Sequence, residues 1–357
     1  MITYGAQAQT PGSDVIVCKT GEKFVGHVVS SNDSSVVFKS DAAGQVTVDW
    51  SKIQELHSPE KFAVIQKGVK LHGAEDENKA PQGTIAVTDQ QVQVTGGAQA
   101  AAQTIPVTNV AQVIDEASFR RAFERRNFFQ AWNGGATAGI AYTNSTQKSQ
   151  SYTAAVNLTR AVPGETWLDQ RSRTVVSFNE AYGKISQPAT PVTKTSIVHL
   201  GVEQDWYLKP RLFVFVQGLF DHNYSQGLNL QQDYGGGLGF VVLKNDRHEF
   251  DIKASLDYIN QRFTIASQNK SLIGSTFGEA YVYKFAHGVV FTESGNYIPA
   301  WNNTTAYSAL ANANLTFPVY HRVGFTVGGI DNYLNDPPLG FKKNSFTLTF
   351  GASYGIQ

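Results

Sequence analysis

Acidic and histidine side chains in the second half of the chain are the groups most able to carry chemistry. Asp221 and His222 are adjacent, and they are the best candidates for a hydrolytic site. Hydrolysis of a lipid would also need a nucleophilic serine beside the histidine, with a polar group to orient it. No catalytic signature of this strength is present. We interpret the pair as a solvated pair at an outer rim, and we predict no catalytic residue and no enzyme activity.

A second set of charged residues recurs at alternate positions along predicted strands. Alternate residues of a strand share one face, so these side chains are expected to line the interior of a β-barrel. The predicted interior residues are His199, Glu203, Asp205, Glu249, Asp251, Lys253 and Asp257. Such charges either pair across a narrow barrel and plug it, or form a ring that selects ions. We favour pairing.

Other kinds of site find little support. The sequence has neither a glycine-rich phosphate loop nor the spacing of metal ligands, so we predict no cofactor and no metal. Cys18 is the single cysteine, which excludes an intramolecular disulfide, and its apolar neighbours Val15 to Val17 predict a small buried side chain. Lys plus Arg and Asp plus Glu number 29 each, and this zero net charge argues against nucleic acid as a partner.

Composition indicates what kind of fold must position these residues. Charged residues make up 16%, against about 25% in ordinary soluble domains, while there are 32 glycines and 12% aromatic residues. We find no apolar run of about 18 residues that could cross a bilayer as a helix. Few charges with many glycines and aromatics are typical of a transmembrane β-barrel, in which apolar residues occupy alternate positions.

The chain from residue 131 to its end alternates long β stretches with turns. The twelve predicted strands span 131–143, 151–161, 171–184, 193–208, 211–223, 228–244, 247–264, 272–286, 289–298, 304–317, 322–334 and 343–356. An even number fits an antiparallel closed barrel, and most stretches reach the nine to eleven residues that a membrane strand needs. Short turns alternate with longer polar loops, except that 162–170 is long on the short side and 299–303 short on the long side.

Side-chain alternation supports a barrel with an apolar exterior. In the last strand Phe346, Leu348, Phe350 and Tyr354 share one face. Trp132 and Tyr142 share a face ten positions apart, which is about 33 Å along a strand and about 25 Å after tilting, the height between two aromatic girdles. We therefore predict girdle positions for Trp132, Tyr142, Phe346 and Tyr354. The glycines at 235–237 and 239 predict sharp curvature or a close side-chain approach.

The front third is predicted to hold two copies of one small SH3-like β unit. Short β runs with polar breaks cover 13–58, and residues 59–115 repeat their pattern with a polar insertion at 74–82 and a low-complexity loop at 96–103. Trp50 is expected to pack in the small core. Residues 1–12 are predicted to be a disordered N-terminus, in which Ala6 to Ala8 resemble a signal-peptide remnant. Residues 116–130 mix Arg with Phe, which predicts a linker or an interfacial helix.

Several barrel motifs resemble a known family. Trp132-Asn133-Gly134-Gly135 opens the first strand, and Asp205-Trp206-Tyr207-Leu208 precedes a tight turn. The segment from Asp221 to Leu230 runs into the glycine-rich segment from Tyr234 to Phe240. These motifs resemble the YdiY-like family of salt-induced outer-membrane proteins, a domain of unknown function. The resemblance covers Phe128 to the end and implies a β-barrel, but it carries over no activity.

The expected fold is thus all-β: a twelve-stranded antiparallel transmembrane β-barrel, residues 131–357, preceded by two small SH3-like units. We expect it in the outer membrane of a Gram-negative bacterium, with the N-terminal region periplasmic. The first functional hypothesis is a porin-like channel of unassigned substrate. The second is a structural protein, anchored by a plugged barrel and presenting residues 13–115 to a periplasmic or envelope partner. The third, least favoured, is an outer-membrane hydrolase. Outer-membrane lipid is the expected partner of the barrel surface.

Overall fold

The computed structural model describes residues 12–71, 74–96, 102–124, 127–144, 148–164, 168–187, 191–245 and 247–356. The chain divides into two compact units, which are described separately. The first contains residues 1–126 and 163–169, and the second contains residues 127–162 and 170–357. The predicted disordered N-terminus lies outside the described residues apart from residue 12, and so does most of the predicted loop at 96–103.

The described part of the first unit is a nine-stranded sheet. Its elements are β1 (Asp14–Cys18), β2 (Lys23–Ser31), β3 (Ser35–Ser40), β4 (Gly44–Asp49), η1 (Trp50–Lys52), β5 (Ile53–Gln66), η2 (Ala74–Lys79), β6 (Gln82–Thr88), β7 (Gln91–Thr95), β8 (Gln103–Pro106), η3 (Val107–Asn109) and β9 (Val110–Asp115). Alternation of apolar and polar residues gives each strand one buried face, as in β7, where Val92 and Val94 are buried.

The pairing of these strands repeats once along the chain. β1 pairs with β2 and with the first half of β5, β9 pairs with the second half of β5, and β6 pairs with parts of both halves. A 3₁₀ turn, η1 or η3, precedes the last strand of each half. β5 runs without a break through the expected boundary at residue 58, and one hydrophobic core contains side chains of both halves. The assignment of two separate SH3-like domains stays a prediction.

Two side chains singled out by the sequence belong to this core. Trp50 is buried, and its indole Nε1 donates a hydrogen bond of 2.9 Å to the carbonyl oxygen of Asn32. Cys18 is buried in the same core, and burial raises the pKa of its thiol. A thiol that is buried and reluctant to ionise is a packing residue rather than a nucleophile.

The linker segment forms one short helix, α1 (Glu116–Phe123). Asp115 caps its first turn, because the Asp115 carboxylate accepts a hydrogen bond of 2.8 Å from the amide of Ser118. Phe119 is fully buried in a cluster with Ala63, Leu71 and other side chains of the first unit. Phe119 therefore packs on protein, where the interfacial interpretation expected its insertion into lipid.

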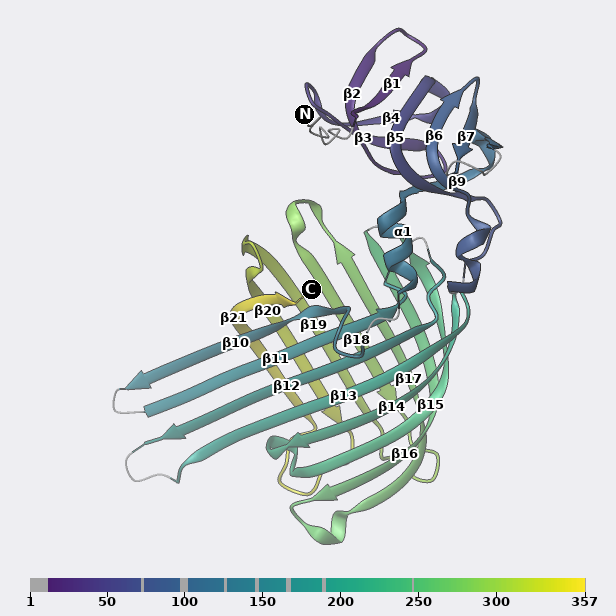
Figure 1. Cartoon of the computed structure of the whole chain (residues 1–357). Coiled ribbons are helices and arrows are strands. Elements are labelled where there is room, and N and C mark those ends of the chain that lie inside the picture. Colours follow the sequence, from purple (N-terminus) through teal and green to yellow (C-terminus); the bar gives the residue numbers. More distant parts are fainter. Residues whose placement is uncertain are drawn as a thin grey trace, which may run out of the picture. The chain divides into compact units, whose positions relative to one another are not determined.

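The second unit is a closed antiparallel barrel of twelve strands, as the sequence predicts (Figure 1). The strands are β10 (Trp132–Asn144), β11 (Lys148–Val162), β12 (Ser172–Ser186), β13 (Thr193–Lys209), β14 (Leu212–Asn223), β15 (Leu228–Lys244), β16 (His248–Phe263), β17 (Lys270–Lys284), β18 (Val290–Ile298), β19 (Ser308–Tyr320), β20 (Val323–Leu334) and β21 (Asn344–Ile356). Short 3₁₀ turns lie in three connections: η4 (Tyr224–Gln226), η5 (Ala266–Gln268) and η6 (Ala286–Gly288).

The connections follow the predicted asymmetry with one error. β13 and β14 are joined by two residues, as are β19 and β20, on the rim where β10 begins and β21 ends. The short connection predicted at 299–303 is wrong, since β19 begins at Ser308 and the connection covers 299–307. Side-chain bonds hold this segment as a turn: the Asn303 carboxamide accepts from the amide of Thr305 at 3.2 Å, and Asn335 donates to the Thr305 carbonyl.

The first and last strands close the ring over a short register. β10 pairs with β21 only from Gly134 to Ala138, opposite Ala352 to Ile356. By contrast, β10 pairs with β11 from Trp132 to Asn144. The five pairs at this seam are enough to close the barrel.

The barrel is apolar outside and polar inside. On β16, Ile252, Leu256 and Tyr258 are exposed, whereas Asp251, Ser255 and Asp257 are buried. On β21, Phe346 is 65% exposed and Leu348 54% exposed. This polarity is the inverse of a soluble domain, and it suits a barrel whose outer wall faces lipid. Among the described residues, no helix is long and apolar enough to span a membrane.

Candidate functional site

The barrel interior is the candidate site, and the structure places the predicted polar residues there. Odd-numbered residues of β13 to β16 point inward, because alternate residues share a face. All seven predicted residues belong to this set: His199, Glu203, Asp205, Glu249, Asp251, Lys253 and Asp257. Their polar contacts fall into separate groups along the inner wall from β12 to β16, and we refer to these groups together as the network.

Arg173 of β12 anchors the network near the rim with short turns. Its Nε lies 2.6 Å from Asp205 Oδ2 on β13, and its Nη1 contacts Asp251 and lies 3.5 Å from Glu249, both on β16. The guanidinium also lies over the Phe213 ring, 5.1 Å from the ring centre. Arg173 thus links β12 to β16 and neutralises a group of carboxylates that are largely shielded from water.

Glycines of β15 provide the space for this packing. A Cβ at Gly239 would lie 2.1 Å from the Phe213 ring, so only glycine lets that ring approach β15 this closely. A Cβ at Gly235 would lie 1.7 Å from Asp257 Oδ1, so the Asp257 carboxylate occupies the space that a side chain at 235 would fill. The close approach that the glycine run predicts is therefore made by Phe213 and Asp257.

Further along the wall the contacts change partners. Lys253 pairs with Glu203 and lies 5.5 Å from the centre of the Phe215 ring. Asp257 accepts hydrogen bonds from Ser255 at 2.8 Å and from Gln217 at 3.4 Å. These residues fill the middle of the inner wall of β13 to β16.

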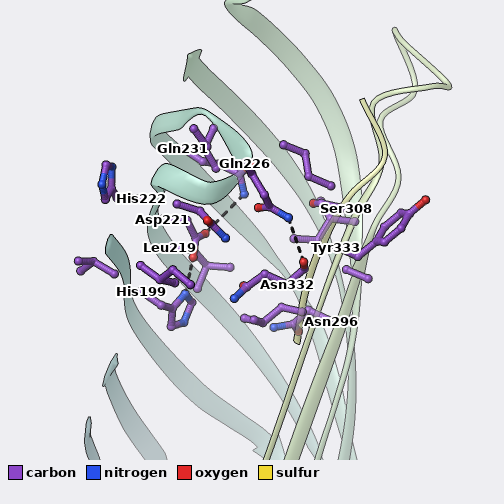
Figure 2. Close-up of a pocket in the computed structure, with 18 residues that line it drawn as sticks. His199, Leu219, Asp221, His222, Gln226, Gln231, Asn296, Ser308, Asn332 and Tyr333 are labelled. Atoms are coloured by element: carbon purple, nitrogen blue, oxygen red, sulfur yellow. Dashed lines mark hydrogen bonds and ion pairs between the residues drawn. The ribbon is translucent and has the colours of Figure 1, made fainter. Parts of the chain in front are cut away.

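The Asp–His pair in the structure differs from the adjacent pair that the sequence suggests. Asp221 Oδ1 lies 2.6 Å from Nδ1 of His199 on the neighbouring strand (Figure 2). His222 instead places Nδ1 2.8 Å from the carbonyl oxygen of Asn229. Asp221 is an interior residue, where the sequence suggested a solvated rim, and it orients His199 rather than His222.

One side chain crosses the barrel near the rim with longer loops. Gln226 of η4 donates a hydrogen bond of 2.9 Å to the Asn332 carbonyl on β20 (Figure 2). It donates a second, of 2.7 Å, to the Lys343 carbonyl just before β21. Nearby, Leu228, Phe263 and Leu334 form a small apolar cluster. β14 and β20 stand six strands apart in the ring of twelve, so Gln226 joins opposite walls and narrows this mouth.

The remaining interior is open. A cavity of about 480 Å³ lies along the inner faces of β10 to β13 and β18 to β21. Many small polar residues line it, including Thr137, Thr153, Asn179, Asn314, Thr316, Thr326, Thr347, Thr349 and Ser353. A second cavity of about 50 Å³ lies between His199, Asp221 and Gln226 (Figure 2). The interior therefore has a packed half, the network described above, and an open half, this 480 Å³ cavity.

The four predicted girdle residues lie on or near the outer surface. Tyr142 is exposed, as are Phe346 and Tyr354. Trp132 is half-buried, and its Nε1 donates a hydrogen bond of 2.8 Å to the Phe128 carbonyl. Their role at the membrane interface stays a prediction.

Sequence reasoning missed three residues that matter to the interior: Arg173, Asp233 and Gln226. Asp233 is fully buried, and neither carboxylate oxygen has a hydrogen-bond partner within the described residues. The alternation of side chains along a strand could have identified Arg173 and Asp233, since both occupy inward-facing positions of their strands. No comparable signal marks Gln226, because its reach across the barrel depends on the tertiary fold.

A family model described as a protein of unknown function, DUF481, matches residues 136–356. The chain belongs to the DUF481 family. The matched region covers the barrel from early in β10 to the end of β21, and the description assigns no activity. No curated protein matches the chain.

Solved structures of outer-membrane proteins show distant likeness. The NanC porin is 9% identical with a TM-score of 0.36, over 63% of this chain and 99% of that chain. An outer membrane channel from Pseudomonas putida F1 is 12% identical with a TM-score of 0.36, over 63% and 93%. The DcaP channel of Acinetobacter baumannii is 12% identical with a TM-score of 0.29, over 96% and 94%. The closed ring with its apolar exterior itself identifies an outer-membrane β-barrel.

Proposed function

We propose that this DUF481 protein is a narrow channel for small hydrophilic solutes in the outer membrane of a Gram-negative bacterium. The open half of the barrel interior carries the proposal. Its cavity of about 480 Å³ is within the range of small-molecule sites, and many hydroxyl and carboxamide groups belong to its lining. Such groups exchange hydrogen bonds with water or a polar solute without the desolvation cost of a fixed charge.

The packed half supports the same function in a different way. Twelve strands form a barrel wide enough that side chains need not fill it, but not so wide that a channel is assured. The network of Arg173 and its carboxylates fills one side and stiffens that wall, so the passage is confined to the opposite side. A narrow passage beside a rigid wall would favour small solutes.

The proposal includes an orientation. Both ends of the barrel chain lie at the rim with the short turns, and in outer-membrane barrels that rim faces the periplasm. Residues 13–115 would then be periplasmic and would present a surface to an envelope partner. Gln226 would narrow the outer mouth.

A plugged anchor is the second candidate, and Gln226 is the observation that favours it. Its two hydrogen bonds tie opposite walls together at one mouth. If the mouth stays closed, the barrel serves only to hold the N-terminal sheet at the membrane. A hydrolase is the weakest candidate, because the adjacent Asp221 and His222 do not form a pair.

Conductance in planar bilayers separates the two leading candidates. We expect discrete conductance steps from the purified protein, smaller steps from Thr349→Trp, which fills the open half, and larger steps from Gln226→Ala, which releases the outer mouth. Leu348→Trp is the matched control, since the neighbouring side chain points outward. Protein that inserts, shows heat-modifiable migration and stays silent as wild type and as Gln226→Ala would support the anchor instead.

A further inference from the structure

A histidine and two carboxylates converge on the N-terminal sheet, far from one another in sequence. Asp14 belongs to β1, His27 to β2 and Glu60 to β5. One potential ligand atom of each residue lies within 4.8 Å of the other two. His27 Nδ1 and Glu60 Oε1 are 3.6 Å apart. Spacings of 13 and 33 residues form no recognisable motif, and only the fold brings these groups together.

Strand pairing explains the convergence. β1 lies between β2 and β5, and Asp14 stands opposite Gly26, beside His27. The pairing of β5 with β6 shifts register between Ser58 and Lys61, which indicates a bulge that contains Glu60. Bulges redirect a side chain that a regular strand would point elsewhere, and here the redirected side chain is the third member of the group.

Asp14 is held in place before any ligand binds. It is fully buried, its Oδ2 accepts a hydrogen bond of 2.6 Å from the Val28 amide, and its Oδ1 accepts one from the Ser58 hydroxyl. The Ser58 hydroxyl in turn accepts a hydrogen bond of 3.1 Å from the Glu60 amide, so one serine ties both carboxylate residues together. Each Asp14 oxygen keeps a further lone pair for a cation.

Charge and access complete the argument. Within the described residues no Lys or Arg forms an ion pair with Asp14 or Glu60, so His27 is the basic side chain closest to these two carboxylates. Burying an uncompensated carboxylate is costly, and a divalent cation would neutralise both charges. The side chains of His27 and Glu60 are 48% and 39% exposed, which leaves an entry path from solvent.

We propose that Asp14, His27 and Glu60 bind a divalent transition-metal cation, with Zn²⁺ as the best match. An imidazole nitrogen with two carboxylate oxygens is a ligand set that zinc accepts, whereas Ca²⁺ and Mg²⁺ favour six or more oxygen ligands. Three protein ligands leave one tetrahedral position for water or for a group from a partner. This site is independent of whether the barrel conducts.

Zinc titration of the full-length protein in detergent tests the proposal. After chelation and buffer exchange, competition with a chromophoric chelator should show one Zn²⁺ bound per chain. We expect His27→Ala and Glu60→Gln each to weaken binding at least about tenfold, since each removes a direct ligand. His57→Ala and Glu55→Gln are matched controls, because both alter exposed residues of β5 outside the group, and they should leave the affinity unchanged.

A second readout covers variants that fold poorly. Asp14→Asn changes a buried hydrogen-bond acceptor and is expected to destabilise the sheet by itself. The decisive variants are therefore those of His27 and Glu60, whose side chains are exposed. Zn²⁺ should raise the melting temperature of the wild-type sheet and of His57→Ala, but not of His27→Ala. Zinc affinity that is unchanged in both His27→Ala and Glu60→Gln, or Ca²⁺ binding as tight as Zn²⁺ binding, would overturn the proposal.

Discussion

Arg173 illustrates how one side chain organises the interior. Its guanidinium contacts carboxylates on β13 and β16 and an aromatic ring on β14, and it is only 11% exposed. A planar guanidinium can donate to several acceptors at once, which a lysine ammonium of similar reach does less well. Removal of the Arg173 guanidinium would therefore leave several carboxylates without their cationic partner.

Arg173→Met should strongly destabilise the barrel. Removing one partner of a buried ion pair leaves uncompensated carboxylates at Asp205 and Asp251, and such losses are typically about 3–5 kcal/mol. The measurement is urea unfolding in lipid vesicles followed by tryptophan fluorescence. Arg171→Met, two residues away and exposed, should change the free energy of unfolding by less than about 0.5 kcal/mol. Equal effects from the two variants would contradict the central role of Arg173.

The residues of the site were only partly predictable from sequence. Alternation predicts which residues point inward, and the seven predicted residues do so. Alternation does not predict which of these side chains contact each other. Arg173 contacts Asp251 across three intervening strands, and Asp221 contacts His199 because of the register between β13 and β14. Neither relation leaves a mark on local sequence. Asp14, His27 and Glu60 were missed for the same reason.

Among the elements, the strands were the most predictable and the connections the least. β15 matches its predicted range, residues 228–244, because turns bound it on both sides and its inner face carries small or polar residues. β19 starts four residues later than predicted, because Asn303 and Asn335 bond to the backbone of the turn before it. Local hydrogen bonds from side chains to the backbone compete with strand pairing, and the alternation of apolar and polar residues does not predict them.

The glycines of β15 determine how closely side chains of the neighbouring strands can approach it. Gly239→Ala should cost about 1–3 kcal/mol, because the added carbon meets the Phe213 ring and forces that ring to move. Gly218→Ala, where a Cβ meets atoms no closer than 3.6 Å, is the matched control. A double-mutant cycle in the same urea assay should show that Phe213→Leu relieves part of the cost. If the free-energy changes of the two substitutions are additive, the contact with the Phe213 ring is not the cause of the destabilisation.

On the scale of the whole molecule, inverted polarity is the property that selects the membrane. Large apolar side chains cover the outside of the barrel, and ionisable groups are enclosed within it. A closed ring also pairs each strand with a neighbour on both sides, which satisfies backbone groups as hydrocarbon requires. Composition and alternation made this property readable from sequence, whereas the continuity of β5 through both halves of the N-terminal sheet was not, since the repeat suggested a boundary there.

Leu256→Arg should impair insertion. Leu256 is 63% exposed near the middle of β16, so the charge would lie near the bilayer midplane, where such substitutions cost about 2–4 kcal/mol. Ile265→Arg is the matched control, because it lies in the connection after β16 and should cost about 1 kcal/mol or less. Folding yield into vesicles, read from heat-modifiable migration, measures both. Similar yields for the two variants would argue against a lipid-facing exterior.

The seam between β10 and β21 has a consequence for assembly. Hairpins form between strands that are neighbours in sequence, but this seam joins strands more than 200 residues apart by five residue pairs. Closing so long a loop costs more chain entropy than any hairpin does, and here the smallest number of backbone hydrogen bonds offsets that cost. The barrel is therefore expected to form by successive pairing of hairpins. The pairing of β10 with β21 closes it last, and these two strands are unpaired edges until that final step.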